Sequence, residues 1–264
     1  MTRETRFLGM AGAWTLDDPK VMSGLLRALA DSDILAPTHW APDERVSLPF
    51  SSEEVLRHQA EREAGVAYVE RREGALRYEA DLGFGRRNVV ALRIVPVVAP
   101  ELWREIFEIA EELCALVRPD YAIVNHGRSF DPWSTKDEMF MTVMSKQGWI
   151  APVDYFSQGP RGLSLRTYFG PRYLAQFPSG LLESTPASHE MTAWGARRLD
   201  LGDVPWSLAP EDALPLWKAA WEHIKPAQVT SQVFAFDERF VSFAPGKRCS
   251  IPTGPDHSGP RENS

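Results

Sequence analysis

The sequence predicts an α+β fold in which an antiparallel sheet carries three to four amphipathic helices, all in a single domain. Several segments place apolar residues at three- and four-residue spacing, which is typical of amphipathic helices. Between residues 66 and 98 the pattern changes to short runs separated by glycine-containing turns, which indicates a strand meander. The 264 residues show no internal repeat and no hinge-like linker. We therefore expect one domain at residues 1–244 and a disordered tail, rich in Pro, Gly and Ser, at residues 245–264.

The elements of the first hundred residues can be placed in order. A first strand is expected within residues 6–14, which mix aromatic, aliphatic and glycine positions. Asp17 or Asp18 can cap a helix that runs to Leu29, and Ser51 can cap a second helix that ends near Gly65. The meander then consists of three strands at residues 67–72, 75–82 and 88–98, with turns at residues 73–74 and 83–85.

The clearest helix of the second half runs from Pro100, which is allowed at a first helical position, to Val117, before Pro119 ends it. A short buried strand follows at residues 121–124. Residues 134–154 fit a helix or a strand equally well, so their structure stays open. Three more strands and a last amphipathic helix are expected, the strands at residues 163–169, 197–201 and 233–243 and the helix at residues 210–224.

Composition and charge exclude several classes of function. With 36 acidic and 29 basic side chains the net charge is −7, which disfavours direct binding of nucleic acid because phosphate contacts need a concentrated basic face. Two cysteines, Cys114 and Cys249, are too few for a disulfide framework or a four-thiolate zinc site. The amino terminus lacks the pattern of a signal peptide, and no apolar run approaches the ~20 residues of a membrane span. We therefore expect a cytoplasmic protein that contacts no membrane.

Histidine is the natural general base near neutral pH, and two of the six histidines stand out as candidates. His39 is followed by Asp43 and Glu44, and His126 precedes Ser129. Neither lies near a nucleophile in a recognisable motif, so both are interpreted as loop-ordering or contact residues. No histidine pair and no carboxylate loop has the spacing of a metal site. We expect no enzyme activity, no metal and no cofactor.

Two features indicate a protein built for contact. Two proline-pinned aromatic segments, residues 37–45 and 168–174, favour rigid surfaces. The helix at residues 100–117 carries a row of acidic side chains that Arg104 does not interrupt, namely Glu101, Glu105, Glu108 and Glu112. Such a row is either a solvated outer face or a surface that faces a cationic partner and speeds its association.

At this point the sequence resembles a known family. The segments Pro37-Thr38-His39-Trp40, residues 149–156 and above all Leu165-Arg-Thr-Tyr-Phe-Gly-Pro-Arg-Tyr-Leu174 resemble the immunity proteins of bacterial polymorphic toxin systems, most nearly the immunity protein 52 family. The resemblance covers roughly residues 5–243. It implies an α+β protein that binds and neutralises a cognate toxin, commonly a nuclease of restriction-endonuclease fold, in interbacterial competition of the kind served by type VI secretion.

An immunity protein of this kind would hold its toxin with buried aromatic or arginine anchors and attract it with acidic side chains. Residue chemistry places the anchors at Trp40, Tyr168, Arg172 and Tyr173, and the steering charges at Glu105, Glu108 and Glu112. Two other classes of function stay open. One is a small cytoplasmic hydrolase or transferase using His39 or His126, and the other is a structural or adaptor protein of a secretion-like assembly.

Overall fold

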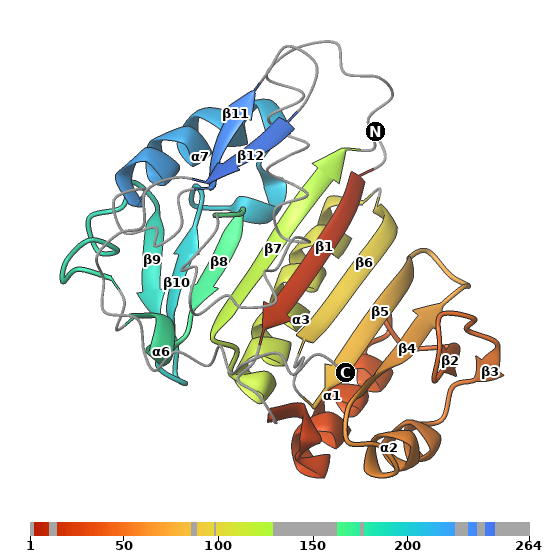
Figure 1. Cartoon of the computed structure of the whole chain (residues 1–264). Helices are drawn as coiled ribbons and strands as arrows, with labels where there is room; N and C mark the ends of the chain where they lie inside the picture. Colours follow the sequence, from red (N-terminus) through yellow and green to blue (C-terminus); the bar gives the residue numbers. More distant parts are fainter. Residues whose placement is uncertain are drawn as a thin grey trace.

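A computed structural model describes residues 3–10, 15–85, 89–97, 99–128, 163–174, 177–224, 232–236 and 241–245 (Figure 1). Its strands are β1 (Arg3–Met10), β2 (His39–Ala41), β3 (Leu48–Pro49), β4 (Gly65–Arg71), β5 (Arg77–Phe84), β6 (Val89–Val97), β7 (Tyr121–Arg128), β8 (Arg166–Phe169), β9 (Ser188–Met191), β10 (Arg197–Asp200), β11 (Gln232–Phe236) and β12 (Val241–Pro245). The first ten form one sheet in the order β3-β2-β4-β5-β6-β1-β7-β8-β10-β9, with every neighbouring pair antiparallel. The predicted α+β class with an antiparallel sheet is confirmed.

Local sequence signals explain where the helices begin. Among the described residues, four helices exceed one turn, namely α1 (Pro19–Asp31), α2 (Ser52–Ala60), α3 (Pro100–Val117) and α7 (Pro210–Ile224), and α6 (Pro171–Leu174) is a single turn. Asp18 caps α1, because its carboxylate accepts a hydrogen bond from the Lys20 amide at 2.8 Å. Ser51 caps α2 in the same way, accepting from the Glu54 amide at 3.3 Å. Both predicted helix starts are confirmed.

The end of α3 is set by one residue in an unusual conformation. Arg118 has a φ of 47°, and its amide donates to the Cys114 carbonyl at 2.8 Å, which closes the last turn. Pro119 cannot continue the helix, so the chain leaves it and enters β7 two residues later. The predicted span of this helix, from Pro100 to Val117, is confirmed.

The sheet separates two hydrophobic cores. On one face α1, α2 and α3 pack against the central strands, with side chains such as Leu25, Val55 and Phe107 fully buried. On the other face α7 covers the β7–β10 half of the sheet, and Trp217 and Phe169 lie in this second core. Strand β7 shows the division plainly, since Ala122 and Val124 belong to the first core while Tyr121 and Ile123 belong to the second. This half of the sheet is therefore buried on both faces.

Several predicted boundaries differ from the structure. The turn expected at residues 83–85 begins later than predicted, because β5 continues through the buried Phe84 and Gly85, with a φ of +82°, is the first turn residue. Gly65 does not end α2 but begins β4, where a side chain would collide with the Phe84 ring opposite. The strand expected at residues 233–243 is instead the hairpin of β11 and β12.

One predicted strand is longer in the structure, and two predicted segments lie outside the described residues. The strand expected at residues 121–124 continues to Arg128 as β7. The open segment at residues 134–154 and the tail from residue 246 onward lie outside the described residues. Within the part of the chain that is described, no helix combines the length and the hydropathy that crossing a bilayer requires.

Candidate functional site

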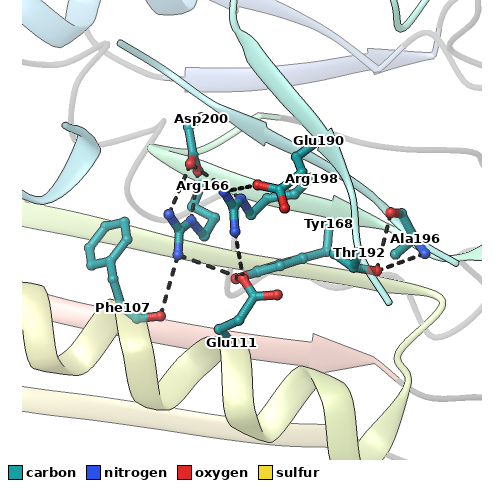
Figure 2. A network of polar contacts seen from close by, with 9 residues as sticks. All are labelled: Phe107, Glu111, Arg166, Tyr168, Glu190, Thr192, Ala196, Arg198 and Asp200. Atoms are coloured by element: carbon teal, nitrogen blue, oxygen red, sulfur yellow. Dashed lines mark hydrogen bonds and ion pairs between the residues drawn. The ribbon is translucent and has the colours of Figure 1, made fainter. Parts of the chain in front are cut away.

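A polar network joins α3 to β8, β10 and β9 in the middle of the molecule (Figure 2). Its centre is Arg166, which enters the protein interior from β8 with only 7% of its side chain exposed. The guanidinium makes two hydrogen bonds to Asp200 on β10, Nε to Oδ1 at 2.6 Å and Nη2 to Oδ2 at 2.9 Å. It also lies over the Phe107 ring at 5.3 Å and donates from Nη1 to the Phe107 carbonyl at 3.4 Å. The fork geometry satisfies both oxygens of the buried carboxylate.

Glu111 extends this network toward the surface. Its Oε2 accepts a hydrogen bond from the Tyr168 hydroxyl at 2.7 Å and another from Nη1 of Arg198 at 3.2 Å. Arg198 then donates from Nη2 to Glu190 on β9 at 2.6 Å. Figure 2 shows these side chains from α3 and three strands meeting one another directly. The network is a chain of mutually satisfied charges that fixes α3 against the second half of the sheet.

The chemistry of this network suits a structural role better than a catalytic one. Burial first, and then the neighbouring Cys114 and Glu111, raise the pKa of the Tyr168 phenol well above its ordinary value. Burial likewise raises the pKa of the Cys114 thiol, so neither group loses its proton near neutral pH. Each carboxylate named here already accepts hydrogen bonds from an arginine or a tyrosine.

Other residues of the segment at residues 165–174 also make contacts within the protein. Gly170 donates its amide to the Asp120 carbonyl at 2.8 Å, and a side chain on Gly170 would lie 2.9 Å from Asp120 Cα and closer still to the Pro119 carbonyl. Pro171 begins α6, and Arg172 donates from Nη1 to the buried Asp120 carboxylate at 3.2 Å. Glycine is therefore required here by close backbone approach. The segment closes the β7–β8 end of the sheet against the turn after α3.

Two predicted toxin anchors are placed wrongly by the sequence. Trp40 is 4% exposed and Tyr168 is fully buried. Trp40 lies on β2 and packs against His58 of α2 with the ring centroids 6.1 Å apart, whereas Tyr168 packs against Trp194 beneath the β9–β10 turn. Neither ring can touch a partner in this conformation.

The remaining predicted contact residues fall into two groups. Arg172 keeps 62% of its side chain exposed although it pairs with Asp120. Tyr173 lies in α6, but its side chain is outside the described part of the structure. All three predicted steering charges, Glu105, Glu108 and Glu112, are exposed on α3.

The acidic row on α3 is interrupted by an ion pair. Arg104 donates from Nε to Oε1 of Glu108 at 2.7 Å, one helical turn away. The expectation that Arg104 leaves the row intact is therefore wrong. Glu101, Glu105 and Glu112 carry no ion pair with the described residues.

The two candidate catalytic histidines lack a catalytic arrangement where the structure describes them. Nδ1 of His39 lies 2.9 Å from the Thr38 hydroxyl. The same hydroxyl lies 3.3 Å from the Glu70 carbonyl and accepts from the Arg72 amide at 3.1 Å, so the His39 ring contacts a hydroxyl that orders the loop. His126 lies on β7 opposite Thr5, and its side chain is outside the described residues.

A second polar feature lies across the sheet from α1 and α2. A hollow of about 510 Å³ is bordered by the loop after β2, from Pro42 to Arg45, and by Val66 and Tyr68 of β4. Tyr68 pairs directly opposite Asp81 of β5, which places both side chains on this same face. The hollow therefore combines an aromatic wall with several carboxylates. Among the described residues, no three His, Cys, Asp or Glu side chains are grouped as metal ligands would be.

Sequence reasoning missed both polar features, although signals for them exist. Glu111 is four residues after Phe107, on the buried side of α3, and a charge there indicates an internal partner. Arg166 is a charge between Leu165 and the aromatic residues of β8, which is a similar signal, whereas Asp200 follows two arginines and gives no such signal. The hollow has no local signal, because β2, β4 and β5 are brought together by strand pairing.

Comparisons with known proteins give a fold and no family. No family model matches the chain, and no curated protein matches it. Among solved structures, the Pseudomonas aeruginosa T6SS protein PA0821 is similar, with a TM-score of 0.55 and 14% sequence identity over 84% of this chain and 72% of that chain. At this identity the likeness shows a shared fold. The immunity protein 52 resemblance gains no support from a family match, and the coarser link, to a protein of a type VI secretion system (T6SS), comes from the fold alone.

Proposed function

We propose that this protein is an immunity protein that binds a cognate antibacterial toxin in the cytoplasm and neutralises it, without any catalytic step of its own. The single observation that carries the proposal is the fold shared with a T6SS protein across 84% of the chain. A nuclease is the favoured toxin, because a DNA-binding surface is basic and this chain has a net charge of −7. The protein would then contact the nuclease and not its nucleic acid.

The described side chains support a binding role over an enzymatic one. The charged network around Arg166 satisfies its own members, and the protonated Tyr168 and Cys114 are buried where no substrate reaches them. His39 contacts the Thr38 hydroxyl, which also contacts the Glu70 carbonyl and the Arg72 amide. These groups give the molecule stiffness, which limits the ordering cost of binding a partner.

Neutralisation requires tight binding, since free nuclease damages the cell. A nanomolar dissociation constant corresponds to about −12 kcal/mol. An interface of ~800 Å² on each partner can supply this free energy when a few anchor residues are well packed. Because Trp40 and Tyr168 are buried, the exposed side chains of Arg172, Glu105 and Glu112 are better candidates for the contact surface.

The proposal is tested by co-expression with the product of the neighbouring gene, which the proposal predicts to be the toxin. Cells that express the toxin domain should survive only when this protein is co-expressed, the two chains should co-purify, and the purified protein should inhibit the toxin in a nuclease assay. Survival without co-purification would contradict direct neutralisation. Turnover of a small metabolite by the purified protein, abolished by His39→Ala, would replace the proposal with an enzyme.

A further inference from the structure

The hollow bordered by Pro42–Arg45, Val66 and Tyr68 is an open depression that is wide enough to admit a long side chain. Its volume of about 510 Å³ is open to solvent on the face of the sheet away from α1 and α2. Pro42, Val66 and the Tyr68 ring are partly exposed and provide apolar walls. Such walls suit the aliphatic stem and flat head of a long side chain better than they suit a bare ion, which needs converging oxygen ligands.

The charge around this hollow is negative and largely uncompensated. Asp43 and Glu44 are exposed on its rim, and Asp81 lies beside Tyr68 on the adjacent strand. Among the described residues that line the hollow, Arg45 is the one cation against these three carboxylates. Asp43 accepts a hydrogen bond from the Arg45 amide at 2.8 Å, whereas Asp81 has no hydrogen bond or ion pair with any described residue.

Partial burial and nearby carboxylates raise the pKa of two side chains at this site, Asp81 and Tyr68. Partial burial, and then Glu79 and Glu44, raise the pKa of the Asp81 carboxyl. Partial burial, and then Asp81, Glu44 and Asp43, raise the pKa of the Tyr68 phenol. Glu79 itself is paired with Arg93 at 3.0 Å, so that arginine is already engaged. A cation placed in the hollow would relieve the repulsion that these carboxylates exert on one another.

We infer that this hollow receives an arginine or lysine side chain presented by the protein partner, with its cationic head between Asp81 and Glu44 and its stem against Tyr68. The Tyr68 ring offers a face for a cation, and the carboxylates offer charged acceptors. That the partner is a toxin rests on the proposed function. The cation site itself rests on the hollow and its charge.

The test compares two variants with the same change in charge. The site variant is Glu44→Gln with Asp81→Asn, and the control is Glu53→Gln with Asp31→Asn, whose side chains are exposed on α2 and α1 across the sheet. Two probes are titrated by NMR and calorimetry, N-acetyl-arginine amide and the neighbouring gene's product, which the proposed function predicts to be the toxin. Tyr68→Leu is a second site variant, since it removes the ring and keeps every charge.

Wild-type protein should show shifted amide signals at Tyr68 and Asp81 on addition of the arginine amide, and the site variant should lose them. For the toxin domain, the site variant should weaken the dissociation constant by about tenfold or more, against less than about threefold for the control. Tyr68→Leu should weaken binding of both probes. Unfolding midpoints measured on the same samples confirm that each variant is folded.

The outcomes separate the two proposals. Toxin binding that is equal in the site and control variants overturns the receptor and leaves the immunity function standing. Arginine amide bound at Tyr68 without any toxin binding supports the cation site and overturns the immunity function. Failure of both probes to bind wild-type protein overturns both.

Discussion

Replacing Tyr168 with phenylalanine isolates one bond of the central network. The substitution removes the hydroxyl that donates to Glu111 at 2.7 Å and keeps the ring, so no cavity forms in the fully buried site. A hydrogen bond to a charged group contributes ~1.5–3 kcal/mol. The Glu111 side chain stays 33% exposed and keeps Arg198 at 3.2 Å, so water can replace part of the loss. We expect the free energy of unfolding to fall by about 1.5 kcal/mol, at the lower end of that range.

Urea unfolding at pH 7, followed by tryptophan fluorescence, measures this loss. For a chain of 264 residues the expected decrease corresponds to a melting temperature lower by roughly 3–6 °C. Tyr168→Ala also removes the ring and should cost ~3–5 kcal/mol. The matched control is Glu112→Gln, next to Glu111 but exposed, which should stay within ~0.5 kcal/mol of wild type.

The same variant decides between two roles for Tyr168. If the Tyr168 hydroxyl acts only inside the protein, Tyr168→Phe destabilises the fold and leaves the affinity of the folded protein for its toxin unchanged. The reasoning is refuted if stability is unchanged and toxin affinity falls, because Tyr168 would then be the surface anchor that the sequence alone predicted. A double-mutant cycle with Glu111→Gln should give a coupling of about 1 kcal/mol, since contacting residues are not additive.

Three further predictions concern other groups. Asp200→Asn removes the nearest carboxylate from the buried guanidinium of Arg166 and leaves only Glu111, at 3.8 Å, so the free energy of unfolding should fall by about 3 kcal/mol in urea titrations. An unchanged midpoint would contradict the buried pair. Burial lowers the pKa of His58 in the folded state, so this histidine favours folding most above its ordinary pKa of 6.5. That contribution is lost as the pH falls through the lowered pKa. Melting temperatures of His58→Gln should therefore depend less on pH than those of the wild type. Neutralising Glu105, Glu108 and Glu112 on α3 should slow toxin association several-fold at low salt. The effect should be small at ~0.15 M salt, where charges are screened over ~8 Å. An association rate that does not depend on salt in either the wild type or the variant would exclude steering by these glutamates.

The local parts of this fold could be predicted from the sequence. Asp18 and Ser51 cap their helices through atoms only two or three residues away, and Pro100 and Pro119 frame α3 from its two ends. The meander of β4, β5 and β6 also follows from short-range turns. Boundaries failed where a distant contact overrode the local signal, as at Gly65, which leaves space for the Phe84 ring.

The candidate sites could be predicted far less well. The aromatic, proline-pinned segments were recognisable, but Trp40 and Tyr168 point into the protein because β2 lies inside the sheet and β8 is buried on both faces. Proline and tryptophan make a segment stiff, and stiffness alone does not determine which face meets solvent. The exposed glutamates were placed correctly because helical spacing alone fixes their face.

The sequence by itself determined the class of fold, the helices with their caps, the acidic balance and the acidic face of α3, because each depends on composition or on neighbours within a few residues. Only the tertiary structure decided that Trp40 and Tyr168 are core residues, that Arg166 meets Asp200 across 34 positions and that Tyr168 meets Glu111 across 57. It also decided that Tyr68 borders a hollow with the loop after β2 and that Asp81 lies beside it on the next strand. The physical reason is that burial and ion pairing depend on which strands become neighbours, and strand order is settled by packing the whole sheet against its helices.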